Sequence, residues 1–273
     1  MKIGAGATVG ALQAGLPLDP LENRILLCHA LGLTRVGLIT NAERVLNEEE
    51  AARLAALVAR RQQGEPIAYI VGQREFFGLP FQVGPAVLIP RPDTELIVEL
   101  ALERLTSGAR MLDMGTGSGA IAVAVAHTQP AARVTALDVS DEALTLAHAN
   151  ASANSATVRF LRSDWFAALD GDIFDLIVSN PPYIPAGDAH LAQGDLRFEP
   201  SGALTDFADG LSALRTIIQG APAHLVAGGW LLLEHGYDQA AAVRALLMEA
   251  GYAEVQSWRD LGGIERVTGG RRS

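Results

Sequence analysis

From about residue 109 onward, the chain alternates short apolar runs with longer segments of helical character. The apolar runs, which read as strands, lie at 110–114, 134–138, 157–161, 174–179 and 230–234. The segments that read as helices lie at 119–127, 141–153, 209–226 and 238–250. This alternation predicts an α/β fold with parallel strands joined by crossovers and with helices on both faces of the sheet. Two further runs, 255–258 and 266–268, would add final strands.

Composition narrows the class of protein. Hydrophobic residues make up 49% of the 273 positions and charged residues 19%, so the chain can bury a sizeable core. The net charge of −10 argues against a protein that depends on nonspecific phosphate contacts. No apolar stretch approaches the roughly 20 residues that span a bilayer, and no Cys/His cluster has metal-ligand spacing. We therefore expect a cytoplasmic protein that works without a membrane or a metal ion.

The N-terminal part reads as a separate, small all-α domain over residues 1–74. One helix is expected to begin at Asp19-Pro20, with Leu21, Ile25, Leu26 and His29 at helical spacing. Another is expected at Asn47, which can cap three following glutamates. Residues 75–92 change to aromatic residues interleaved with Gly and Pro, which predicts a β-hairpin linker. The α/β domain would then occupy 93–273.

A glycine-rich turn follows the first strand of that domain. It comprises Gly115, Thr116, Gly117, Ser118 and Gly119, directly after Asp113-Met114. Glycines at such a turn let the backbone approach a nucleotide-like cofactor closely. The spacing from Gly115 to Ala120 also fits the dinucleotide fingerprint, so this motif alone leaves NAD(P) and S-adenosylmethionine (SAM) both open.

Acidic and aromatic residues at the next strand ends extend the cofactor site. Asp138 ends the second strand, where a carboxylate can accept both ribose hydroxyls of the cofactor. Asp164 could accept from an adenine amino group, and Trp165 could pack on the ring. Asp113 could meet the methionine amino end of SAM or brace the glycine turn.

A second turn, made of Asn180, Pro181, Pro182 and Tyr183, follows the strand at 174–179. The two prolines fix the chain rigidly, while the Asn180 side-chain oxygen and a proline carbonyl can accept both hydrogens of one NH2 group. Tyr183 can stack on a planar substrate. An amide nitrogen is a poor nucleophile, so orientation and fixed dipoles would supply much of the acceleration. The two turns together indicate a SAM-dependent methyltransferase that acts on an amide or amine nitrogen.

At these residues the chain resembles one family, the protein-(glutamine-N5) methyltransferases that modify peptide chain release factors. Further matching segments are Arg60-Arg61 with Gly64–Tyr69, Gly72–Phe76, Leu88–Glu95, Ser163–Phe166, Gln193–Pro200, Leu231–Gly236 and Glu265–Thr268. The matching segments extend from about residue 20 to the C-terminus. The turn Asn180–Tyr183 alone is shared with DNA adenine methyltransferases, whereas this ordered set is far more specific.

The resemblance implies a Rossmann-like class I SAM-dependent methyltransferase domain and a helical N-terminal domain that helps to grip the release factor. SAM would be the cofactor, S-adenosylhomocysteine the product, and the glutamine of the release factors' Gly-Gly-Gln loop the target. Asp138, Trp165, Asn180 and the glycine turn would contact SAM, and Asn180–Tyr183 would hold the substrate glutamine. Arg91, Phe198 and Glu199 would shape the substrate mouth. We expect a monomer with no nucleic-acid requirement.

Other functions fit part of this pattern. A nucleic-acid amino (adenine N6) methyltransferase could use the same Asn-Pro-Pro-Tyr turn, but it would have to grip phosphates despite the acidic charge. A non-catalytic SAM-binding docking module would bind SAM without turnover. An NAD(P) dehydrogenase would leave the second turn without a role.

Overall fold

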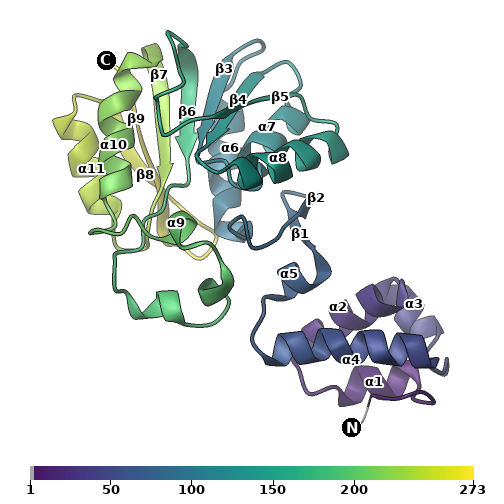
Figure 1. Ribbon diagram of the computed structural model, residues 1–273. Helices are drawn as coiled ribbons and strands as arrows, with labels where there is room; N and C mark the ends of the chain where they lie inside the picture. The colour runs from purple at the N-terminus through teal and green to yellow at the C-terminus, as the bar shows by residue number, and fades with distance from the viewer. Residues whose placement is uncertain (1–2) are drawn as a thin grey trace. The chain divides into compact units, whose positions relative to one another are not determined.

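The computed structural model describes residues 3–273, which divide into two compact units (Figure 1). The first unit ends at Gly72, and the second comprises Gln73–Ser273. Among the described residues, none of the helices combines the length and apolar character that a bilayer crossing requires.

The first unit is helical. Its elements are α1 (Val9–Gly15), α2 (Pro20–Leu31), α3 (Arg35–Thr40), α4 (Glu48–Gln62) and α5 (Ile67–Val71). The side chain of Asp19 caps α2 by accepting from Leu21 N at 2.7 Å. Asn47 and Glu50 form a reciprocal capping box at the start of α4, as the sequence predicts. Both helices therefore begin where their capping residues predict.

The buried face of α2 contains both apolar residues and one polar residue. Leu26 and Leu27 are fully buried in the core of this unit, whereas Leu21 is 48% exposed and His29 also faces solvent. Asn23 takes a core position, and its Nδ2 donates to the Leu16 carbonyl at 3.2 Å. Apolar periodicity does not predict that a polar residue is buried through a hydrogen bond.

A two-stranded hairpin opens the second unit. It pairs β1 (Gln73–Phe76) with β2 (Leu79–Gln82) in antiparallel register. Buried Asn150 bonds both backbone groups of Gln82, with its Oδ1 accepting at 2.7 Å and its Nδ2 donating at 3.0 Å. Asn154 donates to the Pro80 carbonyl at 2.9 Å. These amide side chains join the hairpin to the body of the second unit.

The sheet of the second unit has seven strands in the order β5-β4-β3-β6-β7-β9-β8. They are β3 (Arg110–Met114), β4 (Arg133–Asp138), β5 (Val158–Arg162), β6 (Phe174–Ser179), β7 (Leu225–Glu234), β8 (Ala253–Arg259) and β9 (Glu265–Arg271). Strands β3 to β7 are parallel, and β9 runs antiparallel to both of its neighbours. The predicted α/β fold is confirmed.

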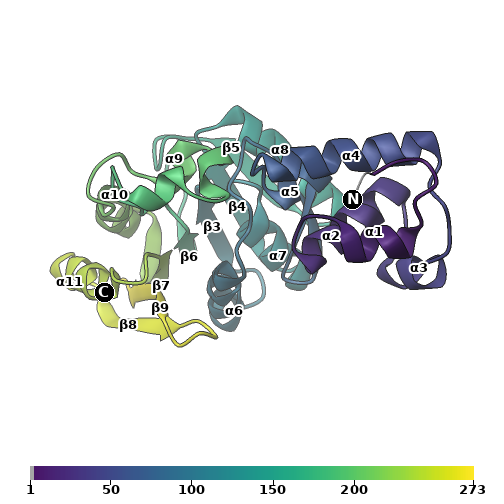
Figure 2. The same cartoon turned by 90° about the horizontal axis from the view of Figure 1, so that it is seen from below.

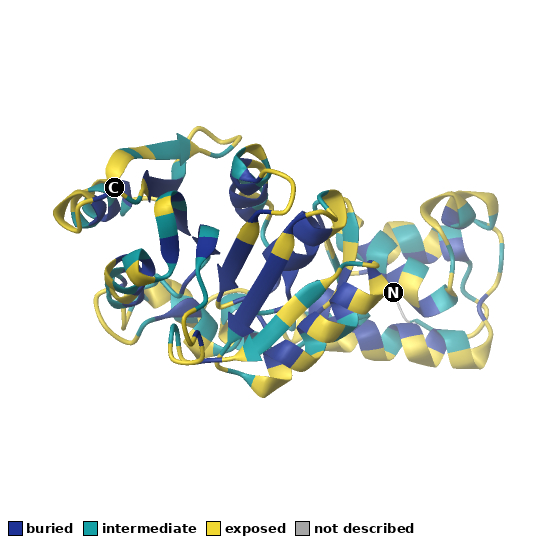
Figure 3. Ribbon diagram, turned by 90° about the horizontal axis from the view of Figure 1, so that it is seen from above, coloured by how far each residue is buried: buried dark blue, intermediate teal, exposed yellow. Residues whose placement is uncertain are grey.

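Helices cover both faces of this sheet (Figures 1 and 2). Alternate residues of β6 enter different cores: Leu176 and Val178 pack with α6 (Glu95–Arg104) and α7 (Ala120–Thr128), whereas Ile177 packs on the opposite face. That opposite core contains residues of α10 (Ser212–Gly220) and α11 (Ala240–Glu249). Helix α8 (Asp141–Ala153) lies beside α7 and β5. The central strands β3, β4 and β6 are consequently mostly buried, whereas the edge strands β5 and β8 are not (Figure 3).

Two expected elements had the wrong limits. The helix expected over 209–226 is shorter, because α10 ends at Gly220 and the short 3-10 helix η4 (Ala221–Ala223) contains Pro222. Strand β7 begins at Leu225, five residues before the apolar run at 230–234. Gly228 and Gly229 lie within the strand and interrupt its apolar pattern, so the pattern does not predict the first half of β7.

The segment between β6 and α10 contains only short helices. They are η2 (Ala189–Ala192), η3 (Leu196–Phe198) and α9 (Ser201–Leu204). A further 3-10 turn, η1 (Pro92–Thr94), precedes α6. Both segments lie next to the carboxyl ends of the parallel strands, where ligands bind in open α/β sheets.

Candidate active site

The predicted site residues come from the carboxyl ends of neighbouring strands. The glycine turn follows β3, Asp138 ends β4, and Asn180 follows β6; these strands are adjacent in the order β4-β3-β6. The chain adds β4 and β5 on one side of β3 and then returns to place β6 on the other side. This reversal of strand order creates the crevice in which such folds bind ligands.

A cavity of about 380 Å³ occupies this crevice. Ten of the predicted residues line it: Arg91, Gly115, Thr116, Gly117, Ser118, Asp138, Asp164, Trp165, Asn180 and Pro182. Asp113, Gly119, Pro181, Tyr183, Phe198 and Glu199 are not among its lining residues. The volume suits a ligand the size of a nucleoside cofactor.

Asp138 holds the glycine turn in place. Its Oδ2 accepts from Gly117 N at 2.9 Å, and its Oδ1 accepts from Ser140 N at 3.0 Å. Ser140 itself caps α8 by accepting from Ala143 N at 3.2 Å, so the carboxylate is not needed as the helix cap. The Asp138 carboxylate therefore has a fixed orientation, and Asp138 lines the cavity.

Gly119 serves the packing of two helices. Its φ of +82° is left-handed, and a Cβ at this position would lie 3.1 Å from the Ala147 Cβ on α8. The close approach of α7 and α8 thus requires a residue without a side chain here. Its role in the described structure is to shape the glycine turn rather than to line the cavity.

Asp113 lies beneath the turn and is fully buried. Its Oδ2 accepts from the Thr116 hydroxyl at 2.7 Å and from Ala122 N at 3.2 Å. Its Oδ1 is buried without a hydrogen-bond partner among the described residues. Burial raises the pKa of Asp113 to about 7, against the lowering effect of its two hydrogen bonds.

Asp164 and Trp165 follow β5 on the cavity wall. Asp164 is exposed and Trp165 is half-buried. Trp165 has a φ of +46°, a strained conformation for a bulky residue. The Ser163 hydroxyl donates to the Trp165 carbonyl at 2.7 Å and thereby helps to hold this conformation.

Asn180 lines the cavity, and its amide group is oriented by a neighbour. Its Nδ2 donates to the Thr94 Oγ1 at 3.2 Å, across a separation of 86 residues in the chain. Thr94 is only 4% exposed, and it also borders the cavity. Pro182 lines the cavity as well, whereas Pro181 is buried behind it.

The Tyr183 side chain points into the protein rather than onto the cavity wall. Its hydroxyl donates to the Glu234 Oε1 at 3.4 Å, and its ring packs against the core that contains α10 and α11. Burial is the main cause of the raised pKa of Tyr183. Burial also raises the pKa of Glu234, which is 2% exposed, to about 7.

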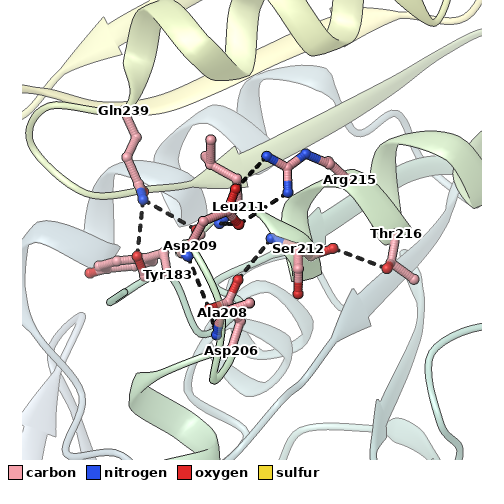
Figure 4. A network of polar contacts seen from close by, with 10 residues as sticks. Tyr183, Asp206, Ala208, Asp209, Leu211, Ser212, Arg215, Thr216 and Gln239 are labelled. Carbon is pink, nitrogen blue, oxygen red and sulfur yellow. Dashed lines mark hydrogen bonds and ion pairs between the residues drawn. The ribbon is translucent and has the colours of Figure 1, made fainter. Parts of the chain in front are cut away.

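The backbone of the turn is held as well (Figure 4). The Gln239 Nε2 donates to the Tyr183 carbonyl at 3.0 Å and to the Gly210 carbonyl at 3.2 Å. Asp206 accepts from Gly210 N at 3.0 Å and from Ser212 N at 2.8 Å, which fixes the segment that packs against the turn. The turn Asn180–Tyr183 is therefore supported by two segments that follow it in the chain.

The three predicted residues of the substrate mouth join two loops. The Glu199 side chain is completely buried; it accepts from Ile89 N at 3.0 Å and forms an ion pair with Arg91. The Arg197 guanidinium lies over the Phe198 ring, 4.9 Å from the ring centroid. In this structure Arg91 and Glu199 brace the loops that border the cavity.

Sequence reasoning did not single out Thr94, Gly210, Glu234 or Gln239 as site residues. Only Glu234 carries a local signal, because an acidic residue that ends a buried apolar strand requires an explanation. The contacts of the others join positions far apart in the chain and emerge only from the fold.

Comparison with solved structures identifies the fold. The fold resembles a methyltransferase from Pyrococcus furiosus, with a TM-score of 0.56 and 22% identity over 79% of this chain and 97% of that chain. It also resembles a 16S rRNA N2 G1207 methyltransferase from T. thermophilus, with a TM-score of 0.56 and 22% identity over 74% of this chain and 50% of that chain. The fold is therefore the one that these methyltransferases share.

Sequence comparison gives the family. Residues 11–72 match the PrmC N-terminal domain, and residues 92–195 match the methyltransferase small domain. The chain is 56% identical to the release factor glutamine methyltransferase of Burkholderia pseudomallei, over 97% of this chain and 96% of that protein. It is 52% identical to the one from Neisseria gonorrhoeae, over 93% and 94%. The chain belongs to the release factor glutamine methyltransferases.

Proposed function

We propose that this enzyme transfers the methyl group of SAM to the side-chain amide nitrogen, N5, of the glutamine in the Gly-Gly-Gln loop of peptide chain release factors. One observation supports this most directly: the Asn180 amide borders the cavity beside the glycine turn, with its nitrogen bonded to Thr94. Its oxygen is then available to accept a hydrogen from a substrate NH2 group.

The residues of the cavity suit SAM. Asp113 lies beneath the glycine turn and does not line the cavity, so it would act on the methionine part of SAM through the turn that it braces. Asp138, held by two backbone N–H groups, would accept from the ribose hydroxyls, and the backbone of Gly115–Gly119 would pack against the cofactor. Asp164 and Trp165 would contact the adenine. SAM supplies the electrophilic methyl group.

The residues Asn180–Tyr183 would hold the substrate glutamine. The Asn180 Oδ1 and a proline carbonyl accept the two NH2 hydrogens, which aims the nitrogen lone pair at the methyl group. The same two acceptors stabilise the positive charge that develops on nitrogen, so no strong base is required for the transfer. Tyr183 would contribute by fixing the turn, because its hydroxyl is directed to Glu234.

The substrate mouth would include Arg91, Phe198 and Glu199, through the loops that the Arg91–Glu199 ion pair joins. We assign substrate recognition to a helical domain over residues 1–74, a connecting role to 75–92, and catalysis to 93–273. The chain would act as a monomer in the cytoplasm, where release factors work, and would need no nucleic acid. A nucleic-acid amine remains the alternative substrate that the same turn could accommodate chemically.

The decisive assay is transfer of labelled methyl from SAM to a purified release factor. A release factor with Gln→Ala in its Gly-Gly-Gln loop and a DNA duplex serve as comparison substrates. We expect label on the native factor only. Label on the duplex, or equal label on the Gln→Ala factor, would contradict the proposal. Asn180→Ala should lose most of the turnover while it keeps the fold.

A further inference from the structure

The large apolar side chains that the second unit exposes are concentrated at one edge of its sheet. Among the described residues of this unit they are Val139, Phe207, Tyr237, Met248, Leu261 and Ile264. Val139 directly follows β4, and Tyr237 lies shortly after β7. Leu261 and Ile264 lie in the turn of the β8–β9 hairpin, beside the end of β7. These four therefore lie at the carboxyl ends of the parallel strands, where the cavity is, whereas Met248 belongs to α11.

Phe207 lies at the same edge, beside the chain that follows β6. It is 67% exposed. The residues on either side of it are paired with that chain: Thr205 forms a parallel bridge with Ile184, and the Ala208 carbonyl accepts from Ala186 N at 2.8 Å. Since Ile184 is the first residue after the turn that lines the cavity, Phe207 is held close to the substrate end of the site.

The backbone at Phe207 is strained as well as fixed. Its φ is +57°, in the left-handed region that bulky residues rarely adopt. Its N–H donates to the Oγ1 of buried Thr205 at 3.1 Å, which holds this conformation. A strained residue with an exposed ring adds nothing to the stability of the fold, so a conformation of this kind indicates a role in function.

Leu261 is fully exposed at the tip of the β8–β9 hairpin. The neighbouring Asp260 fixes this tip, because its Oδ2 accepts from the Arg266 Nε at 3.0 Å. Arg266 also pairs with Asp93 at 3.4 Å. Asp93 directly precedes Thr94, which lines the cavity. The hairpin tip is therefore tied to the cavity wall, at a part of the lining different from the one beside Phe207.

The carboxylates next to these two apolar side chains already have partners. Asp206 accepts from three backbone N–H groups of its own segment. Asp209 pairs with Arg215 at 2.6 Å, and Asp260 pairs with Arg266 at 3.0 Å. Both segments thus offer a partner apolar surface rather than net charge. Such surface suits the apolar side chains of a protein better than the phosphates of a nucleic acid.

We propose that Phe207 and Leu261 are docking contacts for the release factor, and that they pack against apolar side chains on either side of its Gly-Gly-Gln loop. A loop of a folded protein can enter the cavity only if the surface beside that loop meets the edge of the enzyme around the cavity. Both residues lie on that edge. This inference rests on the proposed function and adds how the enzyme recognises the protein that carries the target glutamine.

The test compares Phe207→Asn and Leu261→Gln with the native enzyme, using labelled SAM and purified release factor. Asparagine adopts the left-handed conformation more readily than phenylalanine, so Phe207→Asn should fold at least as well as the native chain. Met248→Gln is the matched control, because Met248 is an apolar side chain with 58% exposure that lies away from this edge. Circular dichroism and SAM binding show that each variant is folded.

We expect Phe207→Asn and Leu261→Gln each to raise the KM for the release factor by about 5- to 30-fold, the effect of losing one well-buried apolar contact at an interface. Docking contacts are the same before and during methyl transfer, so kcat and the Kd for SAM should stay within about twofold of the native values. Met248→Gln should keep the native KM.

A native KM in either folded variant would overturn the docking role of that residue. An equal rise of KM in Met248→Gln would overturn both roles, as would a fall in kcat at unchanged KM, because the segments would then only support the site. If a variant fails to fold, Phe207→Gly or Leu261→Ser replaces it. The proposed function is tested separately by the native enzyme: no label on the release factor, or label on a DNA duplex instead, would refute it, whereas labelling with native KM in all variants would refute the docking role alone.

Discussion

The buried carboxyl group of Asp113 should make the stability of the SAM-free enzyme depend on pH. Its pKa is raised from 3.8 to about 7, chiefly by burial. Between these two values the native state holds a proton that the unfolded chain has released. Stability therefore falls as pH rises from about 4 to about 7, and this group adds no further change outside that window.

The size of the effect follows from the same interval. At about 1.36 kcal/mol for each pH unit, the span from 3.8 to about 7 corresponds to roughly 4 kcal/mol of unfolding free energy. The Asp113→Asn variant has no proton to exchange at this position, so it should lose this part of the slope and keep the part that Glu234 contributes, whose pKa burial also raises to about 7. Glu99→Gln, an exposed change on α6, should retain the whole slope.

Urea unfolding followed by tryptophan fluorescence measures the free energy of unfolding of the structural unit that contains Asp113. All three tryptophans, Trp165, Trp230 and Trp258, lie in the unit Gln73–Ser273, so the signal does not report the helical unit. Unfolding free energies at pH 5 and pH 8 are compared for the native, Asp113→Asn and Glu99→Gln proteins. A native slope that persists unchanged in Asp113→Asn would refute the assignment of this proton to Asp113.

Three further changes have defined outcomes. Gly210→Ala would place a Cβ 2.5 Å from the Tyr183 carbonyl oxygen at a φ of +80°. We therefore expect the free energy of unfolding to fall by about 1–3 kcal/mol and kcat to fall as well, which urea unfolding and methylation rates measure. Asp138→Ala removes the acceptor for Gly117 N and for the proposed ribose hydroxyls, so titration calorimetry should find the Kd for SAM weakened by about 10- to 100-fold. The Glu234 Oε1 accepts from the Tyr183 hydroxyl of the turn, and the pKa of Glu234 is about 7, so native kcat should rise with pH through this value as the carboxylate forms and holds Tyr183 more strongly; a kcat–pH profile of Glu234→Gln should lack that rise.

The fold was predictable from sequence where local patterns and tertiary packing agree. Strand β3 and helix α8 were expected within a residue of their limits, because apolar runs and the Ser140 cap define them locally. The beginning of β7 was not predictable. Gly228 and Gly229 lie where the register between β6 and β7 shifts, and their backbone groups bond to Arg272: Gly228 N donates to the Arg272 carbonyl at 2.9 Å, and the Gly229 carbonyl accepts from Arg272 N at 2.8 Å.

The same distinction applies to the site. Ten of the residues that border the cavity could be predicted, most of them because parallel strands bring their carboxyl ends to one edge, directly before the glycine turn and Asn180. Their supporting partners could not be predicted. Thr94 is 86 residues from Asn180, and Gln239 is 56 residues from Tyr183, so no spacing rule connects these pairs.

The supporting contacts explain how weak acceptors can activate an amide nitrogen. Neutral amide and carbonyl oxygens stabilise developing charge only if they do not have to reorient during the reaction. Thr94 bonds the Asn180 nitrogen, and Gln239 bonds the Tyr183 carbonyl, so each end of the turn is tied by a donor or acceptor outside it. Because those partners are nearly buried or packed against the core, the orientation is set before substrate binds. In our proposal, catalytic power therefore resides as much in the partners of the turn as in the turn itself.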